Sequence, residues 1–124
     1  MRRTSTAFLA VAAVGLVAPG QAFSQEATMK VEPKSVHAGK RVRVFGSAGG
    51  CQPGNTVTLI SRAFPAKHEF AGVPAVFATV RPSGNYSKRV RIPKSKTPKR
   101  YRISARCGGG NLGVSRRVRV LAPL

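Results

Sequence analysis

The chain has 124 residues, of which 22 are Lys or Arg and only three are acidic, so its formal net charge at pH 7 is +19. All three acids are glutamates, and this scarcity excludes chemistry that needs paired, positioned carboxylates, such as glycoside hydrolysis. So large a charge is not neutralised within the chain. It is carried in solvent or met by an external polyanion.

Residues 1–22 have the pattern of a secretory signal peptide. Arg2 and Arg3 form a positive start, residues 7–18 form an apolar run, and Ala22 closes a small-residue cleavage site. The run is too short for a membrane span, which needs about 20 apolar residues. We expect cleavage after Ala22 and an extracellular protein of residues 23–124, either released or held at the cell surface by non-covalent contacts.

Residues 23–124 are expected to form one small domain built from strands. Short β-branched runs alternate with turns rich in Gly, Pro and Asn, and the periodicity is two rather than 3.6. The predicted strands are residues 29–32, 41–45, 56–62, 75–81, 86–92, 100–107 and 114–121. About seven strands in about 100 residues predict an all-β sandwich. The long connection 63–74 holds Phe64 and Phe70, which we expect to be buried as lids on the core.

Valine and arginine alternate along four of these strands, which predicts a buried and an outward face for each. The predicted core side chains are Val42, Val44, Val57, Leu59, Val90, Ile92, Tyr101, Ile103, Ala105, Val118 and Val120. The predicted outward side chains are Arg41, Arg43, Arg89, Arg91, Arg100, Arg102, Arg117 and Arg119. Both outer surfaces should therefore be basic, and part of this charge also protects strand edges against aggregation.

The chain has two cysteines, Cys51 and Cys107. An exported chain folds in an oxidising compartment, where two cysteines favour one disulfide over a metal site. That bridge closes a loop of roughly 56 residues and contributes about 4 kcal/mol in the chain-entropy model. We expect a Cys51–Cys107 disulfide.

Candidate catalytic and metal-binding groups are few. His68 and Glu69 are adjacent but do not form the His-Glu-x-x-His motif of a metalloprotease, and His37 is the other imidazole. A Ser-His-acid triad would lack a recognisable nucleophile motif. We therefore expect no catalytic residue, no metal and no cofactor, and a protein that is not an enzyme.

Several segments taken in order resemble a known family. They are residues 39–44, Cys51 to Gly54 with the strand after it, residues 84–87, and Tyr101 to Asn111. This order resembles small secreted bacterial immunoglobulin-like domains and covers residues 23–124. The resemblance implies an immunoglobulin-like β-sandwich that serves as an adhesion, wall-associated or spacer module. It also implies that the Cys51–Cys107 bridge ties two loops at one end of the sandwich.

Three functional hypotheses follow. In the first, the outward arginines bind an anionic polymer such as wall teichoic acid, nucleic acid, a sulfated glycan or lipid headgroups, because the guanidinium pairs bidentately with phosphate and sulfate. Few aromatics accompany the arginines, so no sequence-specific nucleic-acid recognition is expected. In the second, the charge serves solubility and the loops bind a protein partner. In the third, an apolar cleft binds a ligand, as in secreted immunoglobulin-like chromophore carriers.

Overall fold

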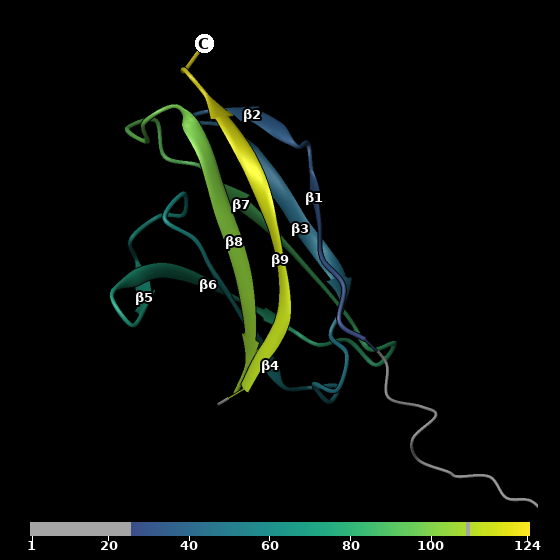
Figure 1. Ribbon diagram of the computed structural model, residues 1–124. Helices are drawn as coiled ribbons and strands as arrows, with labels where there is room; N and C mark the ends of the chain where they lie inside the picture. Colours follow the sequence, from purple (N-terminus) through teal and green to yellow (C-terminus); the bar gives the residue numbers. More distant parts are fainter. Residues whose placement is uncertain (1–25, 109) are drawn as a thin grey trace, which may run out of the picture.

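The computed structural model describes residues 26–108 and 110–124 (Figure 1). The predicted signal peptide, residues 1–22, lies outside them and stays a prediction. The described chain is all-β, as expected, and contains no helix long and apolar enough to cross a membrane. Its strands are β1 (Lys30–Glu32), β2 (Ser35–His37), β3 (Arg41–Ser47), β4 (Thr56–Ile60), β5 (His68–Phe70), β6 (Val73–Thr79), β7 (Asn85–Arg91), β8 (Lys99–Cys107) and β9 (Gly110–Leu121).

The strands form two sheets. One has three strands in the order β1-β3-β7, and the other has six in the order β2-β9-β8-β4-β6-β5. All pairs within the described residues are antiparallel except β2 with β9, which run parallel. In Figure 1, β8 and β9 are the long hairpin; β5 and β6 extend to one side of it, and β2 lies beside β9.

One hydrophobic core joins the two sheets, and alternation along the strands builds it. Every side chain that the sequence placed in the core is buried, among them Val44 at 0% exposure on β3 and Ile103 at 0% on β8. The core also takes side chains that the alternation did not predict: Met29, Val31, Val36, Ala48, Phe64, Val80 and Tyr86.

Two short strands were not predicted. β2 is only three residues long, and it is recognisable through its parallel partner, which places Val36 opposite Val120. β5 lies inside the segment predicted to be a covering loop. It pairs with β6 through a tight turn at Ala71 and Gly72, whose φ angles of 53° and 82° are both positive, as in the type I′ turns that favour hairpins.

The segment 63–74 corrects one prediction. Phe64 is fully buried, as expected, but Phe70 is 37% exposed and is not a lid on the core. The reason is its strand, because β5 lies at the edge of the six-stranded sheet and all three of its residues are exposed. A large apolar side chain in a loop is usually buried, but one at the tip of an edge hairpin has no layer above it.

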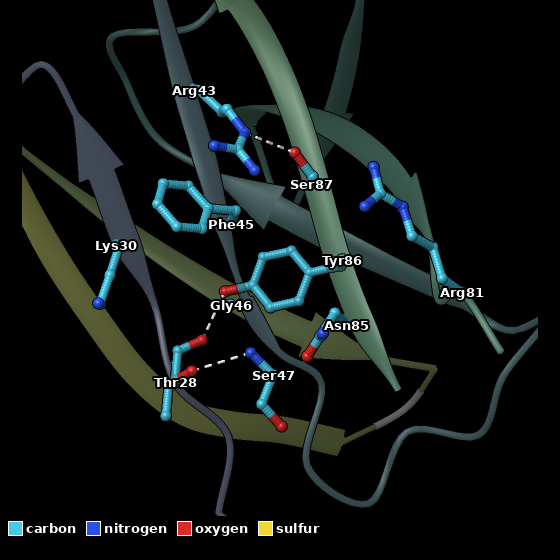
Figure 2. Close-up of a pocket in the computed structure, with 10 residues that line it drawn as sticks. All are labelled: Thr28, Lys30, Arg43, Phe45, Gly46, Ser47, Arg81, Asn85, Tyr86 and Ser87. Atoms are coloured by element: carbon cyan, nitrogen blue, oxygen red, sulfur yellow. Dashed lines mark hydrogen bonds between the residues drawn. The ribbon is translucent and has the colours of Figure 1, made fainter. Parts of the chain in front are cut away.

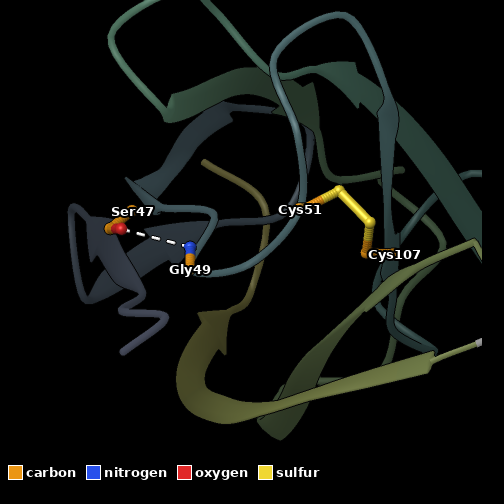
Figure 3. Close-up of a disulfide and its surroundings, with 4 residues drawn as sticks. All are labelled: Ser47, Gly49, Cys51 and Cys107. Carbon is orange, nitrogen blue, oxygen red and sulfur yellow. Dashed lines mark hydrogen bonds between the residues drawn. A yellow bond between two sulfur atoms is a disulfide. The ribbon is translucent and has the colours of Figure 1, made fainter. Parts of the chain in front are cut away.

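The predicted disulfide is formed (Figure 3). Cys51, in the connection between β3 and β4, is bonded to Cys107 at the end of β8, with the two Cα atoms 5.8 Å apart. The backbone before it is fixed by a hydrogen bond that the Gly49 amide donates to Ser47 Oγ. The bridge therefore connects the segment that leaves the three-stranded sheet after β3 to a central strand of the other sheet. A disulfide of this kind is typical of proteins outside the reducing cytoplasm.

Candidate functional site

The register of the strands brings the eight predicted arginines together in two groups of four. In the three-stranded sheet, Arg41 lies opposite Arg91 and Arg43 opposite Arg89. We name these four the β3–β7 cluster. In the six-stranded sheet, Arg100 lies opposite Arg119 and Arg102 opposite Arg117, and we name these four the β8–β9 cluster. Since the two sheets share one core, the clusters lie on opposite outer faces of the molecule.

Both clusters place like charges side by side. All eight arginines are exposed except Arg43, which is half-buried. Directly opposite residues of antiparallel strands have Cβ atoms about 5 Å apart, and like charges there are destabilising. Glu32 lies opposite Arg43 across β1 and β3, whereas no acidic residue lies opposite an arginine of the β8–β9 cluster in the registers of β2, β8 and β9. An external anion would relieve this repulsion.

Arg43 and Arg91 of the β3–β7 cluster are held in place. Arg43 Nε donates a hydrogen bond of 3.0 Å to Ser87 Oγ, and its guanidinium carbon lies 4.0 Å from the centre of the Phe45 ring. Arg91 Nη1 donates a hydrogen bond of 2.7 Å to the carbonyl of Gly39. These contacts lower the entropy that the side chains would lose on binding an anion.

A cavity of about 300 Å³ lies beside Arg43 on this face (Figure 2). Three cationic side chains, Lys30, Arg43 and Arg81, contribute to its lining, together with hydroxyl and amide groups and Phe45. The lining contains no acidic residue. The charge and hydrogen-bonding groups of this cavity suit an anionic group such as phosphate or sulfate.

The floor of this cavity depends on a close approach of two backbones. A Cβ atom on Gly46 would lie 2.2 Å from the carbonyl oxygen of Thr28, so only glycine fits there. The same carbonyl accepts a hydrogen bond of 2.8 Å from the Tyr86 hydroxyl, which Figure 2 shows. Burial raises the pKa of Tyr86 to about 12, although the positive charge of Arg116 acts in the opposite direction. Tyr86 is therefore a neutral hydrogen-bond donor at physiological pH.

The β8–β9 cluster adjoins a second basic cavity, of about 480 Å³. Arg62, Lys99, Arg100 and Arg102 contribute to its lining, which also has no acidic residue. Lys99 Nζ lies 5.1 Å from the centre of the Tyr101 ring, which places this cation over an aromatic face. The six-stranded face is thus basic along β8 as well as across the β8–β9 pair.

Sequence reasoning missed an aromatic group on the six-stranded face. Phe77 on β6 is 42% exposed and Phe70 on β5 is 37% exposed, and both lie close to other ring or guanidinium groups. The signal for Phe77 was present in the sequence, because its neighbour Ala78 belongs to the core and alternation then turns Phe77 outward. For Phe70 no such signal exists, because β5 is only three residues long and shows no alternation of burial.

The two histidines lie at opposite edges of the six-stranded sheet. His37 ends β2, where its Nδ1 lies 2.7 Å from the carbonyl oxygen of Ala122, and His68 begins β5. Among residues 26–108 and 110–124, no three His, Cys, Asp or Glu side chains are grouped as metal ligands would be.

Comparisons with known proteins identify no family and show a distant structural similarity. No protein-family model matches the chain, and no curated protein matches it. Among solved structures, the chain is similar to Pseudomonas fluorescens alkylpurine DNA glycosylase AlkC bound to DNA containing an abasic site analog, with 17% identity and a TM-score of 0.49. The alignment covers 79% of this chain and 31% of that chain, so the chain spans about a third of that protein.

The expectation that the chain is not an enzyme is contradicted by this comparison, because the similar protein is a glycosylase. The expectation rested on the scarcity of carboxylates. That scarcity restricts acid–base chemistry but does not exclude every reaction class. We therefore withdraw the expectation that the chain is not an enzyme. At 17% identity and a TM-score of 0.49, the similarity assigns no activity to this chain.

Proposed function

We propose that this chain is a secreted immunoglobulin-like binding module that holds anionic polymers on its two arginine clusters. The observation that carries the proposal is the register, which sets arginine directly opposite arginine four times. Such an arrangement costs stability in the free protein, and bound phosphate or sulfate groups would relieve the cost. Arginine suits the role because its planar guanidinium forms two parallel hydrogen bonds with such a group.

The strand order supports the immunoglobulin-like part of the proposal. In constant-type immunoglobulin sandwiches the first, second, fourth and fifth strands share one sheet, and the third, sixth and seventh share the other. This chain departs from that order at the counterpart of the fourth strand, because β6 pairs with β4 in the second sheet. Here β1, β3 and β7 form one sheet, while β4, β8 and β9 are consecutive neighbours in the other. The edge strand β2 and the β5–β6 hairpin extend the second sheet.

Secretion is the remaining part of the proposal. The predicted signal peptide at residues 1–22 supports it, and so does the Cys51–Cys107 disulfide, because bonds of this kind persist in oxidising compartments. An extracellular setting would also bring the basic faces into contact with the anionic polymers of a cell surface.

Retention on immobilised heparin and on purified anionic wall polymer across a salt gradient tests the function. Two variants remove one cluster each. The first replaces all four arginines of the β3–β7 cluster with Ser: Arg41, Arg43, Arg89 and Arg91. The second does the same for the β8–β9 cluster: Arg100, Arg102, Arg117 and Arg119. The matched loop variant changes the same number of charges outside the strands: Lys40, Lys67, Lys94 and Lys96→Ser.

We expect both cluster variants to elute at lower salt than the loop variant, because phosphate or sulfate contacts set the salt dependence of binding. Equal shifts for all three variants would show that only net charge matters and would overturn the proposal. Failure of the unmodified protein to be retained on either matrix would do the same, and would favour a protein partner bound by the loops.

A further inference from the structure

The outer face of the six-stranded sheet carries a row of side chains that crosses three strands. Thr58 on β4 lies opposite Phe77 on β6 and opposite Arg106 on β8. The strand neighbours Leu59 and Ala105 are fully buried, so alternation turns this row away from the core. Phe77 and Arg106 therefore share one face with Arg100 and Arg102, because residues of β8 that are an even number of positions apart point to the same side of the sheet.

β5 adds two more side chains to this row. The Arg106 guanidinium carbon lies 4.8 Å from the centre of the Phe70 ring, and the rings of His68 and Phe77 are 5.2 Å apart. Phe70 and Phe77 nevertheless keep 37% and 42% of their surface exposed. We name Phe70, Phe77, His68 and Arg106 the aromatic patch.

The basic cavity of about 480 Å³ lies along β8 on the same face. Its lining includes Arg100, Arg102 and Ser104, and it reaches Asn111, which lies opposite Arg106 of the aromatic patch. From Arg106 to Arg100 the strand runs about 20 Å. Glu69 alternates with His68 and Phe70 along β5, so it belongs to the other side of that strand. The face therefore presents exposed rings at one end and cations along its length.

We propose that this face binds single-stranded nucleic acid, with unpaired bases stacked on Phe70 and Phe77 and phosphates bound by the cavity and the β8–β9 cluster. The inference rests on the proposed function and specifies its polymer. A charged groove beside exposed aromatic rings is how proteins hold single strands without reading sequence, because every base offers a ring face. A polyanion without bases would use the cations but not the rings. Paired bases in a duplex do not expose theirs.

The turn that carries Phe70 supports a role for this hairpin. Ala71 has a φ of 53°, a left-handed conformation that residues other than glycine and asparagine adopt rarely. Strain of this kind persists where surrounding contacts fix the backbone, and it concentrates at ligand-binding sites. Here the Phe70–Val73 strand pair and the contact of Phe70 with Arg106 fix it.

Fluorescence anisotropy with two labelled strands of equal length tests the inference. One is oligothymidylate of about 12 nucleotides, and the other has the same sugar–phosphate backbone with every site abasic. We expect the unmodified protein to bind oligothymidylate roughly tenfold or more tightly than the abasic strand, because stacking on each ring contributes a factor of about five or more. It should also prefer the single strand to a duplex of equal length.

Substitutions of the two rings locate the effect. Phe70→Leu with Phe77→Leu should reduce binding of oligothymidylate to the level of the abasic strand and leave heparin retention unchanged. Phe70→Tyr with Phe77→Tyr should keep the preference, since the rings remain. Phe45→Leu, which removes a ring from the opposite face, is the matched control and should leave the preference for oligothymidylate over the abasic strand unchanged.

Each outcome separates this inference from the function on which it rests. Equal affinities of the unmodified protein for the two strands would overturn the inference and leave polyanion binding intact. No binding to either strand or to heparin would overturn both. If the leucine pair lowers the melting temperature, the comparison of the two strands on the unmodified protein and on the tyrosine pair decides the question.

Discussion

The two outer faces of this molecule are built from the same alternation of arginine and valine, yet they differ in what surrounds the arginines. On the three-stranded face, Arg43 and Arg91 are anchored by hydrogen bonds, and Arg43 covers Phe45. On the six-stranded face, two phenylalanine rings stay exposed, and one of them, Phe70, lies against Arg106 of the basic strand β8. The difference comes from the neighbouring strands. It indicates that alternation sets which side chains point outward, while strand order decides what each of them meets.

The largest expected effect comes from removing the disulfide that links the β3–β4 connection to β8, a central strand of the six-stranded sheet. Cys51→Ala with Cys107→Ala should lower the free energy of unfolding by about 4 kcal/mol, because the bond closes a 56-residue loop. Urea denaturation of the variant and the oxidised parent measures this. The end of β8 near Arg106 should loosen with it, so oligothymidylate binding should fall more than heparin retention. An unchanged midpoint would mean that the bridge contributes little.

Phe70 lies at the surface of the six-stranded face, whereas Phe64, in the same segment, lies in the core. Phe64→Ala should therefore cost about 3 to 5 kcal/mol of stability, as truncation of a buried phenylalanine does. Phe70→Ala should cost less than about 1 kcal/mol, because the side chain is already partly in water. Thermal or urea unfolding of the two single variants decides this. Similar losses at both positions would place Phe70 in the core and remove it from the aromatic patch.

Tyr86, beneath the three-stranded face, makes the free energy of unfolding depend on pH in the alkaline range. Its pKa is raised to about 12 in the folded protein, against about 10 in the unfolded chain. The folded state holds the proton more tightly, so this contribution is complete below pH 10 and is lost as pH rises towards 12. The loss is about 1.4 kcal/mol at pH 11.

Tyr86→Phe is the matched variant for this effect. It should be about 1 kcal/mol less stable than the parent at pH 7, because it lacks the hydrogen bond to Thr28. It should be as stable as the parent, or more stable, at pH 11. Urea unfolding at the two pH values measures the change, and a constant difference between the proteins would show that Tyr86 does not titrate as described.

The smallest effect concerns the hairpin that distinguishes the six-stranded face. Ala71→Asn should raise stability by about 0.5 to 1 kcal/mol, because Asn-Gly is the pair that a type I′ turn prefers. Binding of oligothymidylate should stay within about twofold of the parent if the turn only positions Phe70. A loss of stability on this substitution would contradict the geometry of the turn.

The features of this fold that could be predicted are those that depend on the alternation of neighbouring residues along a strand or on residue type alone. Alternation identified the core side chains from Val42 to Val120, and two cysteines in a chain predicted to be exported sufficed for the disulfide. Strand β9 begins earlier than predicted, at Gly110 rather than Val114. A bulge between Ser104 and Arg106 lets glycine-rich residues pair with the end of β8, and a pattern of hydrophobicity does not reveal it.

The candidate site was predictable only in part. The eight arginines could be assigned to outer faces, but their pairing into two clusters depends on register, which is set by contacts between strands far apart in the chain. The aromatic patch depends on the β5–β6 hairpin pairing with β4, whose other neighbour is β8. Its members Phe70 and Arg106 are separated in sequence by β6, β7 and most of β8, so nothing local links them.

The most direct test of the central claim is the slope of log K against log salt for oligothymidylate binding, compared between two variants of equal charge. One replaces Arg100, Arg102, Arg117 and Arg119 with Ser, and the other is the loop variant of four lysines. If the cluster binds phosphates, the slope measured for the arginine variant should flatten by about 0.7 for each phosphate that it no longer binds. The slope of the loop variant should change little. Equal flattening in the two variants would contradict the claim that the arginine clusters, rather than net charge, form the binding surface.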